Sequence, residues 1–365
     1  MPEISETGLS KDEIETPALL IDLDALERNI NKMADYFSKV EASLRPHAKT
    51  HKTPIIAHKQ IKAGAIGVCC QKLSEAEVMV ASGIDDVLIT NEVVNPSKIK
   101  RLVSLSKHGR IIVAVDDLGV AKATSETAVK TGVKQDVVIE VNVGLNRCGV
   151  EPGKPTVEFA KKLLKLKGLN LVGLLGYEGP FFNIPNFEER KKAANARNKL
   201  LIETRDLLED AGITVEIVSA GATGTYNITG EYPGITEIEA GSYVFMDTTY
   251  TKLAGLDFEY ALTLLTTVIS RPTLERAVVD AGLKEITKEF GIPQVKDVEG
   301  ATLQSLSEEH GTLRLEKTVD LKIGDKIELI PSHCCTTVNL HDKYYCLRDD
   351  MVEAVWNIAA RGKIR

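Results

Sequence analysis

The sequence lacks the features that mark membrane, secreted and nucleic-acid-binding proteins. No apolar run is as long as the roughly 18 residues that a membrane-spanning helix needs. Residues 1–16 are polar and acidic, without the basic and apolar regions of a signal peptide. The net charge of −7 does not favour binding to nucleic acid. We therefore expect a cytoplasmic protein that binds neither membranes nor nucleic acid.

Also absent are the cysteine spacing of a disulfide framework and the glycine signature of dinucleotide binding. The six cysteines include two adjacent pairs, Cys69–Cys70 and Cys334–Cys335, which is awkward for disulfide bonding. Free thiols or metal ligands are the expected use of cysteine in a cytosolic chain of this size. No Gly-rich dinucleotide turn follows an early strand, so an open, doubly wound sheet is the less favoured of two fold alternatives.

What the sequence does contain is an alternation of strand and helix patterns from residue 43 to about residue 245. Short β-branched runs separated by amphipathic stretches indicate parallel βαβ units, and eight of them predict a (β/α)8 TIM-type barrel. The predicted strands are Ala42–Lys49, Ile66–Gln71, Asp86–Thr90, Ile111–Val115, Asp136–Val141, Leu171–Tyr177, Thr214–Ser219 and Ile238–Phe245. The predicted helices are Ser74–Ser82, Pro96–Lys107, Leu118–Thr131, Lys154–Leu166 and Phe187–Ala211.

The pattern changes after Thr248, where strands and turns follow one another without long helices. This change predicts a C-terminal antiparallel β-domain. Its predicted strands are Tyr260–Ser270, Arg276–Asp280, Thr312–Leu315, Lys326–Leu329, Lys343–Arg348 and Met351–Trp356. We expect a barrel over residues 18–250 and a β-domain over residues 251–365, to which residues 1–22 can add a strand.

A basic segment coincides with the first predicted barrel strand. In a strand over residues 42–49 alternate side chains share a face, which places Arg45, His47 and Lys49 together, with His51 just beyond. Four basic groups on one face are costly to bury without anionic partners. The segment therefore predicts a strand end that opens onto an anionic ligand. An exposed basic edge strand is the structural alternative.

The carboxyl ends of the barrel strands, where such folds build their active sites, are rich in polar residues. Gln71, Arg147 and Tyr177 lie at or just after these ends. The loop Ser219–Thr225 contains two glycines, two threonines and a serine, whose amides and hydroxyls could cradle a phosphate. A flexible Gly-rich turn would have the same composition.

A second constellation lies in the predicted β-domain, at Pro331–Thr337. In an extended segment His333 and Cys335 point the same way, and an imidazole with a thiolate suits Zn²⁺ or a similar divalent ion. Two ligands are too few for a closed structural site, so an open catalytic site is predicted. The alternative is a buried pair of cysteines beside a surface histidine.

Taken together, these motifs resemble the D-threonine aldolase and eukaryotic-type D-serine dehydratase family. These are pyridoxal 5′-phosphate (PLP) enzymes of fold type III with an alanine-racemase-like N-terminal barrel. The resemblance covers nearly the whole chain. The segments that carry it are Glu15–Leu19, Asp22–Asp24, Arg45–Lys52, Gly67–Lys72, Ser74–Glu77, Asn146–Gly149, Val279–Gly282, Ser307–Gly311 and His333–Cys335.

The resemblance implies a role for each motif. Lys49 would hold PLP as a Schiff base, Arg147 would donate to its phenolate oxygen, and Tyr177 would lie against the pyridine ring. His333 and Cys335 would bind Zn²⁺ or Mn²⁺. The expected catalytic residues are Lys49 and His51. The expected cofactor-binding residues are Lys49, Gln71, Arg147, Tyr177, Ser219, Gly221, Thr223, Gly224, Gly241, Ser242 and Tyr243.

The implied reaction is cleavage of a D-3-hydroxy amino acid. Breaking the Cα–Cβ bond of D-threonine gives glycine and acetaldehyde, and this aldolase activity is favoured. Loss of the 3-hydroxyl from D-serine or D-3-hydroxyaspartate gives a 2-oxo acid and ammonia. Family aldolases usually carry His-x-Asp where Cys335 stands, which supports the dehydratase, whereas the surrounding sequence supports the aldolase. The resemblance also implies a homodimer with shared active sites.

Two other functions remain alternatives. An amino-acid racemase would need a second base facing Lys49, typically a tyrosine, and would leave the His333–Cys335 pair without a role. A PLP-binding homeostasis protein shares the barrel but has no β-domain, so residues 250–365 argue against it.

Overall fold

The computed structural model describes residues 6–179, 181 and 183–365. The chain forms two compact units. The barrel unit comprises residues 32–49, 54–241 and 363–365, and the β unit comprises residues up to 31, 50–53 and 242–362. The chain passes from the β unit to the barrel unit within helix α1 (Leu23–Phe37).

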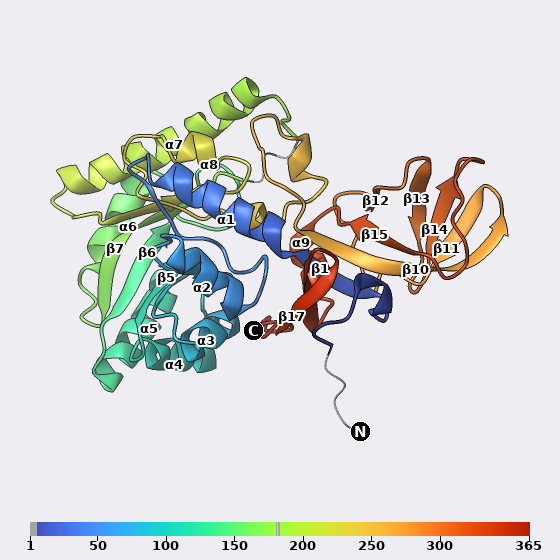
Figure 1. Ribbon diagram of the computed structural model, residues 1–365. Coiled ribbons are helices and arrows are strands. Elements are labelled where there is room, and N and C mark those ends of the chain that lie inside the picture. Colours follow the sequence, from blue (N-terminus) through green and yellow to red (C-terminus); the bar gives the residue numbers. More distant parts are fainter. Residues whose placement is uncertain (1–5, 180, 182) are drawn as a thin grey trace. The chain divides into compact units, whose positions relative to one another are not determined.

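The barrel unit is a sheet of eight parallel strands with helices between them (Figure 1). The strand order is β2-β9-β8-β7-β6-β5-β4-β3. The strands are β2 (Ser43–Leu44), β3 (Val68–Cys70), β4 (Asp86–Ile89), β5 (Arg110–Val115), β6 (Gln135–Glu140), β7 (Leu169–Gly176), β8 (Ile217–Ala220) and β9 (Glu237–Ile238). The helices are α2 (Pro54–Lys62), α3 (Leu73–Ala81), α4 (Pro96–Leu105), α5 (Leu118–Thr131), α6 (Lys154–Leu163), α7 (Phe187–Asp210) and α8 (Tyr226–Thr229).

Two backbone hydrogen bonds connect the ends of this strand order and close the barrel. The amide of Cys69 donates to the carbonyl of Pro46, and the amide of Ala48 donates to the carbonyl of Cys69. The predicted TIM-type barrel is therefore confirmed. Inside the sheet, side chains of strands β3 to β8 pack into one buried cluster: Cys69, Leu88, Ile112, Ala114, Val138, Val172, Leu175 and Ile217.

Two predicted strands are much shorter than the sequence suggested. The first strand, predicted over Ala42–Lys49, is regular only at Ser43–Leu44 and has one further bridge at His47. Pro46 has no amide hydrogen, so it cannot donate to a continuous ladder. The last strand, predicted over Ile238–Phe245, ends at Ile238, and a 3-10 helix (η2) occupies Ser242–Val244. Both strands therefore end in irregular backbone.

The β unit is built on one mainly antiparallel sheet. Strand β1 (Ala18–Asp22) lies inside it, antiparallel to β10 (Leu262–Thr273) and parallel to β16 (Lys343–Arg348). The other strands are β11 (Arg276–Val279), β12 (Gln294–Lys296), β13 (Ala301–Leu306), β14 (Gly311–Leu315), β15 (Lys326–Ile330) and β17 (Met351–Asn357). The short helices are η1 (Lys11–Glu13), η3 (Tyr250–Lys252) and α9 (Cys334–Val338). The expected antiparallel β-domain is thus confirmed, with β12, β13 and α9 not foreseen.

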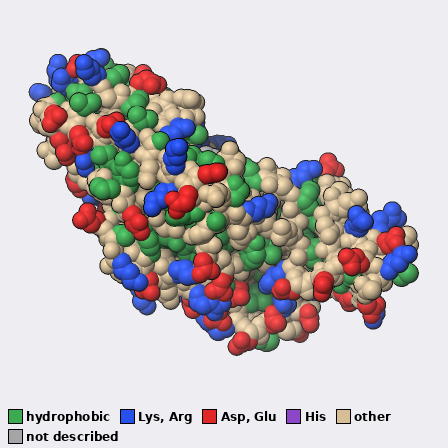
Figure 2. All heavy atoms as spheres, turned by 90° about the horizontal axis from the view of Figure 1, so that it is seen from above, with side chains coloured by type: hydrophobic (Ala, Val, Ile, Leu, Met, Phe, Trp, Pro, Cys, Tyr) green, Lys and Arg blue, Asp and Glu red, His purple; other side chains and the backbone are tan. Residues whose placement is uncertain are grey.

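On the face that Figure 2 shows, acidic and basic side chains are intermixed rather than gathered by sign. Mixed charge of this kind does not make the extended basic surface that binds a phosphate backbone. Among the described helices, none is long and apolar enough to span a membrane.

Candidate active site

Lys49 follows a buried stretch of the first barrel strand whose charges are already compensated. Arg45 is 1% exposed, and its guanidinium donates to Glu237 at 3.1 Å and to Asp86 at 2.5 Å. His47 Nε2 lies 3.1 Å from the hydroxyl of Thr90. The idea that the whole basic face meets an anionic ligand is therefore wrong for Arg45, because two carboxylates of the barrel neutralise it.

Sequence reasoning missed a buried carboxyl group close to Lys49, that of Glu239. The hydroxyl of Ser219 donates to Glu239 Oε1 at 2.8 Å. Burial raises the pKa of Glu239 to about 8, with a further increase from Glu237 and a partial decrease from Ser219 and Lys49. A carboxyl that is neutral at neutral pH can donate a hydrogen bond as well as accept one. The position of Glu239 two residues before Gly241 was the available signal, but a strand-end glutamate alone is not specific.

The loop after β8 has fewer unoccupied donors than its composition suggested. The amide of Gly221 donates to Glu178 Oε2 at 2.9 Å, and the hydroxyl of Thr225 donates to Glu178 Oε1 at 2.5 Å. Glu178 is 2% exposed, and burial raises its pKa. Gly221 has φ +81°, and an added Cβ would lie 2.9 Å from Ile238. Glycine is therefore required for this turn, and a carboxylate holds part of it.

Arg147 and Tyr177, expected to contact the cofactor, lie together on the barrel unit. The guanidinium of Arg147 is 5.5 Å from the centre of the Tyr177 ring and 3.7 Å from Glu140 Oε1. Burial, together with the neighbouring Glu92, raises the pKa of Glu140 to about 8. Glu92, Glu140 and Cys148 place one ligand-type atom each within 4.8 Å of the others. This acidic cluster was also missed, because its members come from three separate segments.

The other barrel residues of the expected set are at least partly buried. The side chain of Gln71 donates to the carbonyl of Thr90 at 3.2 Å. Thr223 is 1% exposed, and the carbonyl of Gly224 accepts from Arg190 at 2.9 Å. Gly241 is buried. It follows Ala240, whose carbonyl accepts a hydrogen bond from the backbone amide of His47 at 3.1 Å. Lys49, Ser219, Glu239 and Gly241 thus belong to neighbouring strand ends of one barrel.

The predicted metal-ligand pair belongs to the β unit, with a local geometry that differs from the prediction. His333 has extended backbone and is the N-cap residue, whereas Cys335 lies in the helix that begins at Cys334. Even so, the ligand atoms of His333, Cys334 and Cys335 all lie within 4.8 Å of one another. Burial lowers the pKa of His333, but Cys335 and Asp247 outweigh it and raise that pKa to about 11. The carboxylate of Asp247, 2.9 Å from the ring, and the sulfur of Cys335 place electron-rich groups where a cation would be favoured.

Residues next to the expected lysine and glycine contact this pair within the β unit. The hydroxyl of Thr50, which follows Lys49 in the chain, is 3.4 Å from the sulfur of Cys335. The hydroxyl of Ser242, which follows Gly241, is 4.0 Å from the same sulfur. The sulfur of Cys335 therefore lies beside the hydroxyls of Thr50 and Ser242 within the β unit.

His51 and Tyr243, also in the expected set, are fully buried in the β unit. The amide of Thr53 donates to His51 Nδ1 at 3.2 Å, and the hydroxyl of Tyr344 donates to the His51 carbonyl at 2.7 Å. A neutral His51 ring therefore carries its proton on Nε2. The ring of Tyr243 packs against Phe258 at a centroid distance of 5.6 Å.

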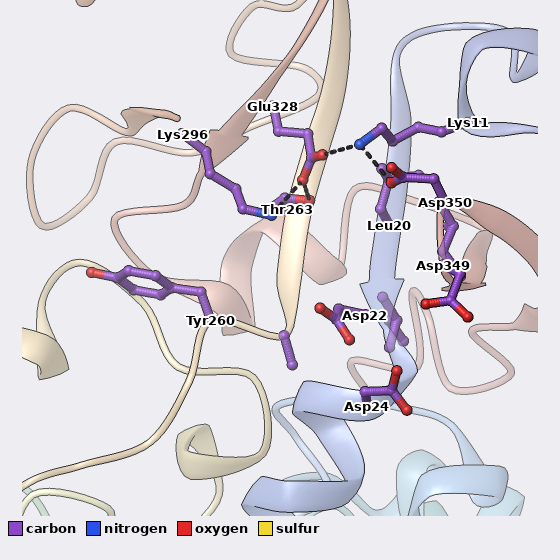
Figure 3. A pocket seen from close by; sticks show the side chains of 13 residues that line it. Lys11, Leu20, Asp22, Asp24, Tyr260, Thr263, Lys296, Glu328, Asp349 and Asp350 are labelled. Atoms are coloured by element: carbon purple, nitrogen blue, oxygen red, sulfur yellow. Dashed lines mark hydrogen bonds and ion pairs between the residues drawn. The ribbon is translucent and has the colours of Figure 1, made fainter. Parts of the chain in front are cut away.

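A separate cavity of about 260 Å³ lies in the β unit and is lined mainly by charged side chains (Figure 3). Glu328 in its wall accepts from Lys11 at 3.1 Å and from Lys296 at 3.1 Å. Asp350 pairs with Lys11 at 2.7 Å, and Asp22 accepts from the amide of Ala25 at 2.9 Å. Five carboxylates and two lysines line the cavity, so its lining is acidic, and it includes none of the expected site residues.

Comparison with known proteins identifies the family. Residues 21–249 match the family described as "Alanine racemase, N-terminal domain", and residues 261–347 match the "Putative serine dehydratase domain". The 3-hydroxy-D-aspartate aldolase of Paracoccus denitrificans (strain Pd 1222) is 40% identical over 366 residues, which cover 98% of this chain and 94% of that protein. The chain belongs to the D-threonine aldolase and D-serine dehydratase family.

Members of this family are PLP-dependent lyases, so the expectation of a PLP-dependent lyase is confirmed. The D-threonine aldolase of Arthrobacter sp. is 37% identical over 366 residues, covering 99% of this chain and 97% of that protein. The crystal structure of D-threonine aldolase from Filomicrobium marinum matches with a TM-score of 0.96 at 39% identity. That match covers 99% of this chain and 100% of the other.

A dehydratase of the same family is more distant. The D-threo-3-hydroxyaspartate dehydratase of Delftia sp. (strain HT23) is 29% identical over 368 residues, which cover 94% of this chain and 97% of that protein. The aldolases therefore share more of their sequence with this chain than the dehydratase does. The structural match to the aldolase extends over both the barrel unit and the β unit.

Proposed function

We propose that this enzyme is a PLP- and divalent-metal-dependent aldolase that cleaves D-3-hydroxy amino acids, with D-threonine giving glycine and acetaldehyde. The observation that carries the proposal is the 37–40% identity to two aldolases over nearly the full chain, against 29% to a dehydratase. The 3-hydroxy-D-aspartate aldolase activity of one relative makes that amino acid the second substrate to test.

The barrel residues fit PLP by the chemistry of their side chains. Lys49 supplies an amine, Arg147 a guanidinium, and Glu239 a buried carboxyl with a raised pKa. Gly221 keeps the loop after β8 free of a side chain where a Cβ would meet Ile238. Lys49 would hold the cofactor covalently, and Ser219, Gly221, Thr223, Gly224, Gly241 and Ser242 would surround its phosphate. When bound, PLP supplies an electron sink for charge that develops on the substrate.

The β unit fits a divalent metal by the same criterion. His333 and Cys335 bring an imidazole and a thiol within 4.8 Å, and the electron-rich surroundings of the ring favour a cation. A thiolate ligand favours a zinc-like ion, although Mn²⁺ remains to be tested beside Zn²⁺. A bound divalent ion acts as a Lewis acid and lowers the pKa of a coordinated hydroxyl.

The chain's own residues would then hold the substrate and move its protons. Lys49 would exchange with the substrate amine, and Arg147 beside Tyr177 would orient the cofactor ring. His51 has a defined tautomer, because Thr53 donates to Nδ1 and leaves the proton on Nε2. That nitrogen is the one through which His51 would exchange a proton.

A dehydratase acting on D-serine or D-3-hydroxyaspartate is the second candidate, and one observation favours it. Cys335 stands where family aldolases usually carry an aspartate. We weigh this single residue below the full-length similarity to aldolases. We further propose a homodimer, for which the resemblance to the family is the support. The free cysteines agree with the expected cytoplasmic location.

The test is product identification after incubation with D-threonine, D-serine and L-threonine in the presence of PLP and Zn²⁺ or Mn²⁺. Formation of glycine and acetaldehyde from D-threonine but not from L-threonine supports the aldolase. A 2-oxo acid with ammonia assigns the enzyme to the dehydratase branch instead. Racemisation of alanine with neither product would contradict a lyase function. Sedimentation of the active enzyme tests the dimer, which an active monomer would refute.

A further inference from the structure

Asp247 is a buried carboxylate to which neither sequence analysis nor the proposed function gives a role. It is 0% exposed and follows η2 in the β unit. Oδ1 accepts from the backbone amides of Thr249 and Tyr250, at 3.1 and 3.0 Å. Oδ2 accepts from His333 Nδ1 at 2.9 Å and from the amide of Cys334 at 3.3 Å. One oxygen therefore holds the local turn, and the other holds the predicted metal-binding segment.

The contact with Asp247 decides which nitrogen of His333 is available to a metal. A carboxylate accepts hydrogen bonds and donates none, so the Nδ1 that faces Asp247 carries the ring proton. The lone pair of a neutral His333 is then on Nε2. That nitrogen lies 4.0 Å from Glu289 Oε1, which places a second carboxylate on the same side of the ring. Phe290 packs edge-on against the ring at 5.1 Å between centroids and limits its rotation.

We propose that Asp247 is a positioning residue that holds His333 with its proton on Nδ1 and presents Nε2 to the metal. Hydrogen bonding of a ligand histidine through its other nitrogen fixes the ring and increases its basicity. The inference rests on the proposed function, since it assumes that His333 and Cys335 bind a metal. It adds the ligand atom, Nε2, and the residue that selects it.

If Asp247 only stabilised the local turn, its substitution by asparagine would leave metal binding unchanged. If Asp247 positions His333, the same substitution should weaken metal binding. The side-chain oxygen of asparagine can still accept from the amides of Thr249 and Tyr250 and so preserve the turn. Its NH₂ group, however, would face the Nδ1 proton of His333 and the amide of Cys334, which are both donors. His333 would then turn its proton to Nε2, where it blocks metal binding.

The experiment is titration of metal-free, PLP-loaded enzyme with Zn²⁺ and Co²⁺ by calorimetry, with Co²⁺ absorption as a second readout. We expect Asp247→Asn to lower metal affinity by about 10- to 100-fold while PLP absorption stays unchanged. Asp280→Asn is the matched control, because Asp280 also accepts from a backbone amide and two hydroxyls in the β unit, at 2.8, 2.6 and 2.6 Å. Its metal affinity should equal that of the wild type.

The outcomes separate this inference from the proposed function. Equal affinities of Asp247→Asn and wild type would overturn the role of Asp247 and leave the metal site intact. A wild-type enzyme that binds no metal would overturn the metal part of the proposed function. If Asp247→Asn does not fold, an NMR measurement on the wild-type enzyme tests the inference instead. Cd²⁺-loaded, ¹⁵N-histidine-labelled enzyme should show coupling of the metal to Nε2 of His333, and coupling to Nδ1 would refute the inference.

Discussion

Two buried carboxylates that lie close together in the sequence, Glu239 of the barrel unit and Asp247 of the β unit, have contrasting surroundings. Glu239 accepts from the hydroxyl of Ser219, and burial raises its pKa to about 8. Asp247 accepts from three backbone amides and an imidazole. Glu239 can therefore gain or lose a proton near neutral pH, whereas the feature of Asp247 is that both of its carboxylate oxygens accept hydrogen bonds.

This contrast is the one we expect if the barrel unit holds the proposed cofactor and the β unit holds the proposed metal. The barrel contains two buried carboxyl groups, Glu239 and Glu140, whose pKa values are raised to about 8 and whose charge can therefore change near neutral pH. The β unit holds His333 and Cys335 in one arrangement through buried hydrogen bonds, as a metal ligand set requires. Substitutions in either unit should therefore affect different properties.

Loss of Lys49 should have the largest effect on activity. It should abolish covalent attachment of PLP without affecting metal binding. We expect Lys49→Ala to lower activity by about 10³-fold or more, since no other group can hold PLP covalently at this position. Metal uptake by the β unit should persist. Borohydride reduction followed by peptide mass spectrometry should find PLP on Lys49 in the wild type. The same result is expected for the control variant Lys62→Ala, which lacks an exposed lysine. PLP trapped on another lysine of Lys49→Ala would refute the assignment.

Replacement of Arg45 tests whether its buried ion pairs stabilise the barrel. Arg45→Met leaves Glu237 and Asp86 without their cation, which should cost about 3–5 kcal/mol in the free energy of unfolding. Arg101 of the barrel unit, whose side chain is 42% exposed and pairs with Glu77, is the control, and Arg101→Ala should cost less than about 1 kcal/mol. Urea denaturation measures both. Equal losses would show that burial does not distinguish these two arginines.

Loss of a metal ligand should have the opposite pattern to loss of Lys49: the metal should be lost and PLP retained. We expect His333→Ala to lower activity by more than about 100-fold and to abolish metal uptake while PLP remains bound. Metal analysis by mass spectrometry and the visible absorption of PLP measure the two properties separately. His108→Ala, at an exposed histidine of the barrel unit, is the control. A His333→Ala enzyme that retains its metal would contradict the assignment of this ligand.

The pH dependence of stability should distinguish Glu239 from an ordinary carboxylate. Its folded pKa is raised from 4.5 to about 8, so the folded state binds more protons between these values. The wild-type apoenzyme should therefore lose stability as pH rises through that window, whereas Glu239→Gln has no such term. From pH 5 to pH 9 the variant should gain about 4 kcal/mol relative to wild type in urea denaturation. A pH-independent difference would show that Glu239 is not buried as described.

The sequence predicted the barrel, because eight strand patterns alternate with helices, and four helix starts, at Pro96, Leu118, Lys154 and Phe187, agree with the structure. Lys49 and the His333–Cys335 pair were proposed as site residues from the specific motifs that surround them, and these roles stay predictions. The sequence did not reveal Arg45 as a neutralised core residue, since Glu237 and Asp86 are distant in sequence. Glu239 and Asp247 were missed for the same reason. The role of a carboxylate depends on neighbouring residues that are distant in sequence and are brought together only by the fold.

The central claim is that the substrate's Cα–Cβ bond is cleaved, and 3-hydroxy-D-aspartate tests it most directly because both branches of the family act on such a compound. Cleavage of Cα–Cβ gives glycine and glyoxylate, whereas loss of the 3-hydroxyl gives oxaloacetate and ammonia. Quantification of glycine and ammonia in one reaction distinguishes them. The account predicts glycine in step with substrate consumed and no ammonia above the enzyme-free control. Ammonia released in step with substrate, without glycine, would contradict it.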